Sequence, residues 1–269
     1  MTNEFWHAHK FRFIVPCIVF VLWELISRSG LFPAALFPPP TTVLLVWLDW
    51  IFGMTGSAEV NSGVWFNDVL SSGIRVMLGY FIAVIVGVTA GVAIGWSKIV
   101  EKMVEPTIQM LRPIPPVSWI PLAIIWFGIA DKPAIFLVFL GSFFPIVVNA
   151  IQGVKTTDKN LIRAASMMGA KRWKLIRYVI LPAALPSIFT GLRLGIGIAW
   201  ALTVTAEMIA VKSGLGYVLW DSYYFLRYDL VMASMASIGL MGFLMDFLIK
   251  KLMDRTLHWQ RNTSVQGMS

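Results

Sequence analysis

Charged residues are scarce in this chain. Only 13% of its 269 residues are Asp, Glu, Lys or Arg, while 58% are hydrophobic. A soluble domain usually carries about 25% charged residues. So few charges do not cover a water-facing surface, and we predict that lipid covers much of the molecule as one membrane domain. Short alternating segments typical of a membrane-spanning strand barrel are also lacking, which favours helices.

Residues that carry out chemistry are equally rare. Cys17 is the sole cysteine, which excludes an intrachain disulfide and a cysteine metal cluster. The three histidines, His7, His9 and His258, lie near the ends of the chain, so a catalytic Ser-His-Asp or Cys-His arrangement is not expected. No Walker phosphate-binding loop occurs. The sequence therefore predicts a chain that is not an enzyme, that binds no metal and that has no cofactor of its own.

Six apolar stretches are long enough to cross roughly 30 Å of hydrocarbon as helices. Prolines 113, 115 and 116 interrupt the third of them. The fold class predicted is an all-α membrane protein with six transmembrane helices, at about 12–32, 75–96, 103–128, 133–154, 185–210 and 230–250.

The chain divides into four predicted segments. Residues 1–34 form a signal-anchor span, because Lys10 and Arg12 precede an apolar run with no clear cleavage site directly after it. Residues 35–74 form an external interfacial segment. Residues 75–255 form the core domain, which contains the basic loop 153–182, and residues 256–269 form a cytoplasmic tail.

The external segment contains a stiff Pro38-Pro39-Pro40 run. We predict that Thr41 or Thr42 caps the helix that follows. This helix is expected to be amphipathic and to lie at the membrane surface with Trp47 and Trp50 as anchors.

Positive charge predicts the orientation. With the N-terminus inside, the pieces 1–12, 97–105, 153–182 and 250–269 hold fifteen of the 22 Lys and Arg residues, and the external pieces hold three. Cytoplasmic loops carry such an excess of Lys and Arg. Both termini are therefore predicted to be cytoplasmic, and the net charge of +8 reports topology and not nucleic-acid binding.

The loop 153–182 has a pattern of its own. Asp158 can cap a short helix and Gly169 can end it. Ala164, Ala165 and Ser166 give that helix small side chains, which let a partner approach closely. The stretch 171–180 mixes basic and apolar residues and is expected to lie along lipid headgroups before the chain re-enters the bilayer at Pro182. The alternative is a loop whose positive charge serves topology alone.

This loop resembles the EAA loop of the permease subunits of ABC importers. The resemblance is carried by Ala164-Ala165, Gly169 and Leu181-Pro182. The sequence departs from the family pattern at Arg163, where the family usually has Glu, and at Val179, where it often has Ile. In that family the loop forms a coupling helix that fits a cleft in the ATPase. The residues expected to couple to the ATPase are Asp158, Arg163, Ala164, Ala165, Ser166, Gly169, Ala170 and Lys171.

The resemblance covers about 35–255 and includes the motifs Leu111–Pro116, Trp119–Leu122, Trp126–Ile129 and Gly214–Tyr217, which resemble the branch that imports taurine, alkanesulfonates, nitrate or bicarbonate. It implies the type I ABC-importer fold in a bacterial inner membrane. It also implies a homodimer, two ATPase subunits that bind ATP and Mg, and an external substrate-binding protein. The solute expected is a small anion or zwitterion, an organosulfonate such as taurine first and nitrate or bicarbonate second.

Ionisable residues inside apolar spans usually face a cavity, a partner or an interface. We assign five residues to the substrate pathway: Arg112, Trp119, Arg193, Trp200 and Glu207. The last three are spaced by seven and share a helical stripe, but Arg193 and Glu207 are about 21 Å apart and do not pair with each other. The structural alternatives are that Arg193 reaches the headgroups, that Glu207 bonds to a neighbouring helix and that Arg112 tethers its loop.

Two further questions stay open in the sequence. Segment 214–228 either dips into the outer leaflet and closes the pore or forms a plain interfacial aromatic belt. A stand-alone secondary transporter or channel is the alternative function. It predicts inverted repeats or a series of membrane carboxylates, and neither is visible in the sequence.

Overall fold

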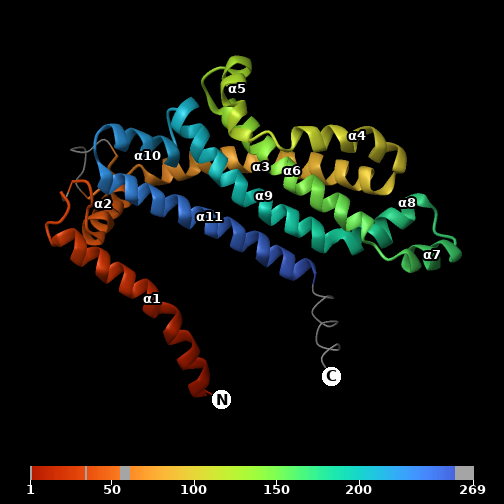
Figure 1. Cartoon of the computed structure of the whole chain (residues 1–269), viewed down its shortest axis with the longest axis horizontal. Helices are drawn as coiled ribbons and strands as arrows, with labels where there is room; N and C mark the ends of the chain where they lie inside the picture. The colour runs from red at the N-terminus through yellow and green to blue at the C-terminus, as the bar shows by residue number, and fades with distance from the viewer. Residues whose placement is uncertain (1, 34, 55–60, 258–269) are drawn as a thin grey trace.

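The computed structural model describes residues 2–33, 35–54 and 61–257, with side chains from residue 14 onward, and the regular structure in these ranges is helical (Figure 1). The elements are α1 (Thr2–Arg28), α2 (Pro40–Phe52), α3 (Trp65–Trp96), α4 (Lys98–Leu111), η2 (Pro116–Trp119), α5 (Ile120–Phe127), α6 (Asp131–Lys155), α7 (Lys159–Met167), α8 (Arg172–Leu175), η3 (Ile176–Ile180), α9 (Leu181–Ala210), α10 (Leu215–Tyr224) and α11 (Tyr228–Thr256).

Within the described residues, four helical stretches are long and apolar enough to cross a membrane: α3, α6, the run from α8 through α9, and α11. A fifth arises if α4 and the η2–α5 pair count as one span, and these two halves are bent by 87°. The break lies at the expected prolines, because Pro115 and Pro116 cannot continue a helix. The first expected span, 12–32, overlaps α1, which ends at Arg28 and whose side chains are described only from Ile14 on.

The centre of the bundle is α6, which packs between α3 and α9. Glycines on α3 allow the close approach. A methyl group on Gly79 would lie 2.5 Å from the carbonyl oxygen of Ile135, and one on Gly95 would lie 2.7 Å from Cβ of Val154. Small residues at such spacing let two backbones meet, which is a common basis of helix packing in membranes.

The helical stretch that contains α9 begins well before the expected span 185–210. α8, the π-helical turn η3 and α9 form one continuous stretch of 39 residues, Arg172–Ala210. The stretch 171–180 is thus continuous with α9, and its expected place along the lipid headgroups stays a prediction. A single π-helical turn is the usual form in which a π-helix occurs inside an α-helix. This one ends two residues before Pro182, whose ring and missing N–H disturb the preceding turn.

Two expectations for the external segment are wrong. α2 starts with Pro39 as its N-cap and Pro40 in its first turn, with no side-chain cap, while Thr41 bonds to Glu24 of α1. α3 begins at Trp65, whereas the expected span began at 75. The charge of Arg75 suggested a membrane boundary, but its side chain is buried inside the helix bundle.

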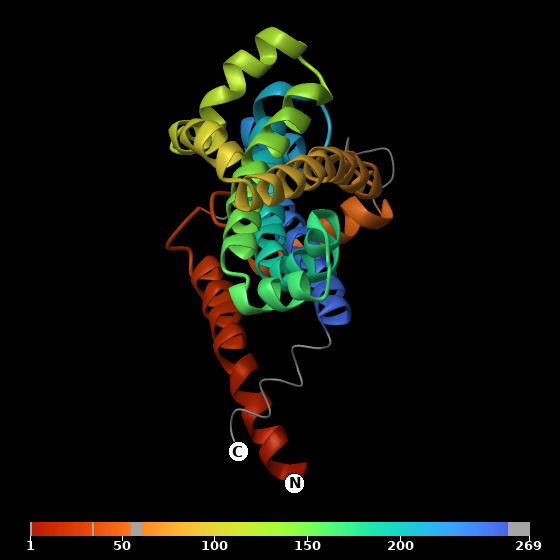
Figure 2. The ribbon, with the colours of Figure 1, turned by 90° about the vertical axis from the view of Figure 1, so that its right-hand side faces the viewer.

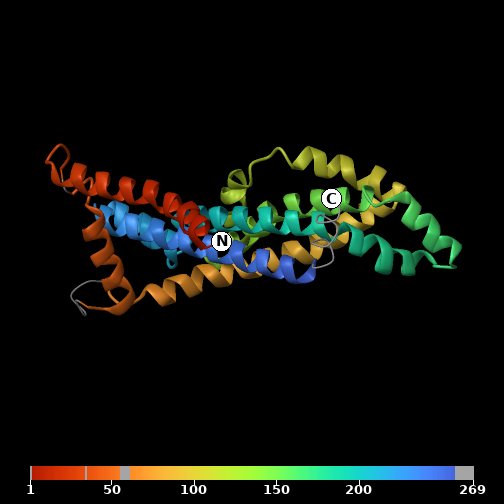
Figure 3. The ribbon, with the colours of Figure 1, turned by 90° about the horizontal axis from the view of Figure 1, so that it is seen from below.

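The molecule is elongated, and its two ends differ. α7 and α8 form one end, at the right of Figure 1, while α2 and α10 lie toward the other, and the view from below agrees (Figure 3). α1 leans away from the remaining helices (Figure 2) and contacts mainly α2. α9 therefore connects the end that carries α7 with the end that carries α10.

Candidate functional site

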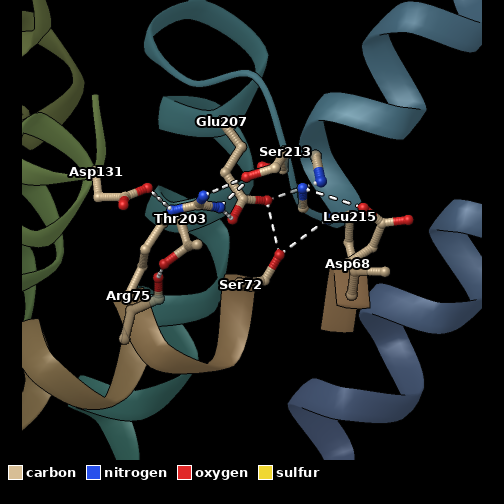
Figure 4. A network of polar contacts seen from close by, with 11 residues as sticks. Asp68, Ser72, Arg75, Asp131, Thr203, Glu207, Ser213 and Leu215 are labelled. Atoms are coloured by element: carbon tan, nitrogen blue, oxygen red, sulfur yellow. Dashed lines mark hydrogen bonds and ion pairs between the residues drawn. The ribbon is translucent and has the colours of Figure 1, made fainter. Parts of the chain in front are cut away.

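A polar cluster lies inside the bundle at the end that carries α10 (Figure 4). Its centre is Arg75 of α3. The guanidinium donates from Nη1 to Glu207 Oε1 of α9 at 2.6 Å, and from Nε to Asp131 Oδ1 at the start of α6 at 2.7 Å. It also donates to Ser213, from Nη1 to the carbonyl oxygen at 2.8 Å and from Nη2 to Oγ at 2.6 Å. We call Arg75, Glu207, Asp131, Ser213 and Ser72 the Arg75 cluster.

The second oxygen of Glu207 is occupied as well. Oε2 accepts from Ser72 Oγ and from the backbone N–H of Gly216, both at 2.9 Å. Ser72 Oγ in turn accepts from the backbone N–H of Leu215 at 2.9 Å. The orphan N–H groups at the start of α10 therefore find their acceptors on α3 and α9.

The cluster needs glycine at the start of α10. Gly214 has φ +107°, and a methyl group there would lie 2.6 Å from Glu207 Oε1 and 2.7 Å from Arg75 Nη1. A methyl group on Gly216 would lie 2.6 Å from the carbonyl oxygen of Val204. These two glycines let the chain between α9 and α10 pass directly over the ion pair.

The central pair is hidden from solvent. The side chains of Arg75 and Glu207 are 4% and 0% exposed, whereas Asp131 is largely exposed. Charges that leave water lose several kcal/mol each unless their partners and hydrogen bonds compensate. Here the guanidinium makes four bonds and the buried carboxylate makes three, which meets that condition.

The sequence pointed to only part of this cluster. Glu207 stood out because it interrupts an apolar span, and the structure gives it a bond to a neighbouring helix, which was the structural alternative. Arg75 was missed because it was placed at the end of a span. The signal that marks it is apolar sequence on both sides, from Val69 and Leu70 to Val76 and Met77.

At the other end of the molecule the predicted helix in the loop 153–182 is present. The carboxylate of Asp158 accepts from the backbone N–H of Asn160 at 2.8 Å and caps α7. Gly169 follows the helix with φ +81°. Its N–H donates to Ser166 and that of Ala170 to Ala165, both at 3.0 Å, which closes the helix end in the way typical of a glycine stop. Both predicted boundaries of the helix are confirmed.

The faces of α7 divide the predicted coupling residues. Arg163, Ala164 and Ser166 are exposed, while Ala165 is only 7% exposed. Three consecutive helical residues differ by about 100° each and do not share one face. Three large apolar side chains are also exposed on this helix and directly after it, namely Leu161, Met167 and Met168.

An open groove of ≈ 420 Å³ runs between α7 and the start of α9. Its walls include Leu161 and Ala164 of α7, Met168 directly after that helix, Tyr178 of η3 and Pro182 of α9. Lys171, expected to couple to the ATPase, is exposed and is the N-cap of α8. Large apolar side chains left in the open at a loop are typical of a contact surface for another protein.

The residues assigned to the substrate pathway are scattered. Arg112 is exposed at the bend that follows α4, and Trp119 ends η2 half-buried against Ile120 and Ala134. Trp200 is buried in the centre of this chain, and its indole N–H has no hydrogen-bond partner among the described residues. The structure does not bring these three together.

Arg193 and Glu207 have separate partners, in line with the distance argument. Arg193 forms a two-bond ion pair with Asp246 of α11, Nε to Oδ1 at 2.9 Å and Nη2 to Oδ2 at 2.8 Å. Its side chain is 36% exposed and that of Asp246 is 41% exposed. Arg193 therefore remains accessible in the single chain, whereas Glu207 does not, and their assignment to the pathway stays a prediction.

Several apolar helices long enough to span a membrane, joined by a loop that presents a short capped helix with an open apolar face, define a multi-spanning membrane protein. Comparison with known proteins gives the particular family. Residues 79–257 match the family described as binding-protein-dependent transport system inner membrane component, and the chain belongs to this family. It is the permease subunit of an ABC importer, as the sequence predicted.

Several relatives match over nearly their full length. The chain is 35% identical to the taurine transport system permease protein TauC of Escherichia coli (strain K12), over 96% of this chain and 97% of that protein. It is 33% identical to the putative aliphatic sulfonates transport permease protein SsuC of Bacillus subtilis (strain 168), over 93% and 87%. It is 30% identical to the bicarbonate transport system permease protein CmpB of Synechocystis, over 91% and 89%.

A solved structure supports the fold. A chain from inward-facing MetNI, a methionine ABC transporter, superposes with a TM-score of 0.61 at 19% identity, and covers 71% of this chain and 95% of that one. The predicted type I importer fold is confirmed. The family is one of inner membrane components, so this chain is a membrane protein.

Proposed function

We propose that two copies of this chain form the membrane pathway of an ATP-driven importer for a small organosulfonate such as taurine. The observation that carries the solute class is the match to TauC along almost the whole of both chains. SsuC, a relative of similar identity, is named for aliphatic sulfonates. Nitrate or bicarbonate is the second candidate, favoured by the relative CmpB, which is named for bicarbonate.

ATP hydrolysis belongs to a partner in this proposal. Two ATPase subunits, which hold ATP and Mg, bind the exposed face of α7 in the two copies. Leu161, Ala164 and Met168 supply an open apolar face with a small residue at its centre. Arg163, exposed on α7 beside this face, adds a positive charge where the family usually has a negative one. A partner surface that is acidic at the matching position accommodates it.

The orientation proposed has both termini in the cytoplasm. The loop 153–182, which carries α7, holds seven of the 22 Lys and Arg residues, in accord with the excess of positive charge on cytoplasmic loops. The end with α10 and the Arg75 cluster then faces outward, where an external binding protein delivers the solute.

Reconstitution tests the function. The chain is purified with its cognate ATPase and binding protein and placed in liposomes with ATP inside the compartment that the ATPase faces. We expect accumulation of labelled taurine that stops when ATP is left out. Uptake of nitrate or bicarbonate without uptake of any organosulfonate would move the solute to the second candidate. Accumulation against a gradient by this chain alone would contradict the importer.

Cysteine labelling tests the orientation. Cys17 is first replaced by Ser, and a single cysteine is placed at Lys212 or at Lys171, both of which are exposed. A membrane-impermeant maleimide added to intact cells should label position 212 and leave position 171 unlabelled. Labelling of position 171 but not of position 212 would show that the protein has the opposite orientation in the membrane.

A further inference from the structure

We propose that Arg75 is a positioning residue for transport: it fixes the outer segment 211–216 and α10 to the end of α9, so that these parts move as one body when the partner ATPase acts on α7. This inference rests on the proposed function and orientation. It concerns how motion at one end of the molecule reaches the other.

The first support is the continuity of α9. The helical stretch Arg172–Ala210 starts next to the loop that carries α7 and ends three residues before Ser213. Ile162 of α7 packs against the start of this stretch, beside Ile180 and Ala184. Glu207 lies in its last turn. A single helix therefore runs from the coupling loop to the Arg75 cluster.

The second support is the number of elements that the cluster joins. Arg75 and Ser72 come from α3, Glu207 from α9 and Asp131 from α6. Ser213 belongs to the connection to α10, and the first N–H groups of α10 bond into the same set. The bonds of Ser213, Leu215 and Gly216 to this set would have to break if segment 211–216 swung away from α9 by itself.

The third support is burial. Breaking the contacts of Arg75 would leave the carboxylate of Glu207 charged, fully buried and without its counter-ion. Interfaces and packed cores switch between discrete arrangements and do not deform continuously. A gate that had to expose this pair in every cycle would be costly, whereas one that keeps the pair intact and moves as a whole is not.

The fourth support is what the cluster borders. An open hollow of ≈ 470 Å³ lies between the α5–α6 connection and the α9–α10 connection, and its lining includes Ile129, Asp131, Val211, Lys212 and Ser213. Arg75 bonds to a residue on each side of it, Asp131 and Ser213. The guanidinium thus sets the separation of the two walls of this outer hollow.

The test uses the complete complex in liposomes and compares three chains. In the double variant Arg75→Met with Glu207→Met both charges are removed together, so no unpaired charge stays buried. Ser213→Ala removes one bond to the outer segment and leaves the ion pair in place. The matched control is Glu24→Met with Arg28→Met, which removes an exposed ion pair from α1 near the same end of the molecule.

The first readout is the number of solute molecules taken up per ATP hydrolysed. We expect the double variant to lower this ratio about tenfold while ATP hydrolysis continues, a change equivalent to about 1.4 kcal/mol and of the size that residues between two coupled sites produce. Ser213→Ala should lower the ratio less, and the control should leave it unchanged.

The second readout is one that a purely structural role would not move. A cysteine at Lys212, in a chain with Cys17→Ser, is labelled from outside in the nucleotide-free and the vanadate-trapped complex. In the otherwise unchanged chain the labelling rate should differ between the two states, and in the double variant that difference should disappear.

Several results would decide against the inference. A double variant that assembles, keeps the normal ratio and keeps the state-dependent labelling overturns it. If the double variant does not assemble, Ser213→Ala with normal ratio and labelling overturns it instead. Absence of ATP-driven uptake by the unchanged complex speaks against the proposed function, and the labelling difference at position 212 then decides the inference by itself.

Discussion

Helix α9 carries one ionised residue in its middle and one near its outer end, and the two are held in different ways. Arg193 pairs with Asp246 of α11 through two hydrogen bonds, and more than a third of each side chain is exposed. Glu207 pairs with Arg75 of α3, and neither side chain is open to solvent. The same kind of interaction thus appears on one helix in an open and in a closed setting.

The difference lies in what else each pair holds. The buried pair shares its donors and acceptors with Asp131, Ser213, Ser72 and the backbone of α10, so it joins several elements. The open pair joins only α9 and α11, and both of its side chains are partly exposed. A buried pair has a high cost of disruption, whereas an exposed one contributes little to stability. The four expectations below test this contrast.

The largest effect is expected for Arg75→Met. The substitution leaves Glu207 buried without a counter-ion, which typically costs about 3–5 kcal/mol. We expect a marked fall in the unfolding temperature of the purified complex and in the amount of complex that assembles in the membrane. Thermal unfolding in detergent and fluorescence-detected size exclusion measure the two effects.

Arg75→Lys is the matched control for this change. An ammonium group keeps the charge but not the planar set of donors that reaches Glu207, Asp131 and Ser213 together. It should recover part of the lost unfolding temperature. If Arg75→Met were as stable as the unchanged chain, the contrast between the two pairs of α9 would be wrong.

A smaller effect is expected for Glu207→Gln. The carboxylate accepts from Arg75 on one oxygen and from Ser72 and the N–H of Gly216 on the other. An amide has one oxygen, so one of these donors meets an NH₂ group and loses its acceptor, at a cost of about 1–3 kcal/mol. The unfolding temperature should fall less than for Arg75→Met. An equal or larger fall would assign the dominant role to the glutamate.

The features with local sequence signals could be predicted, whereas the buried cluster of residues from several helices could not. The helix in the loop 153–182 could be predicted because its signals are local. The capping carboxylate of Asp158 and the glycine stop at Gly169 are eleven residues apart. The spans were legible because apolar length is also local. The four later spans expected from the sequence overlap the helices α4–α5, α6, α9 and α11, with the ends of α6 and α9 placed closely.

The Arg75 cluster could not be predicted from the sequence because its members are far apart along the chain. The pair joins residues 132 positions apart, and only the packing of α3 against α6 and α9 brings them together. A charge beside an apolar run has two explanations, a membrane boundary or a buried partner, and the choice depends on that partner. Trp50 was expected to anchor its helix at the membrane surface, and this expectation is wrong for the same reason. Its side chain is buried, and its indole N–H donates to Asp68.

The third expectation concerns the coupling end, where the contacts are open. Gly169→Val forces a β-branched residue into φ +81°, although a side chain there would meet nothing within 4 Å. The cost is local, about 1–2 kcal/mol of backbone strain. We expect the complex to assemble with nearly unchanged stability but to hydrolyse ATP without uptake, because the end of α7 is displaced. Gly169→Asn, which tolerates this conformation better, should retain more uptake per ATP, and normal uptake by Gly169→Val would contradict docking through α7.

The smallest effect on stability is expected at the open pair. Arg193→Gln leaves Asp246 partly exposed, and an exposed ion pair is worth less than about 1 kcal/mol. The unfolding temperature should therefore hardly change. If Arg193 lines the solute pathway, as its place inside an apolar span predicts, the same variant should raise the KM for uptake of an anionic solute while ATP hydrolysis continues. Asp246→Asn provides the matched control, since it frees the guanidinium and should lower that KM or leave it unchanged. A large loss of stability with an unaltered KM would show that both ion pairs of α9 are structural, and the distinction between them would fail.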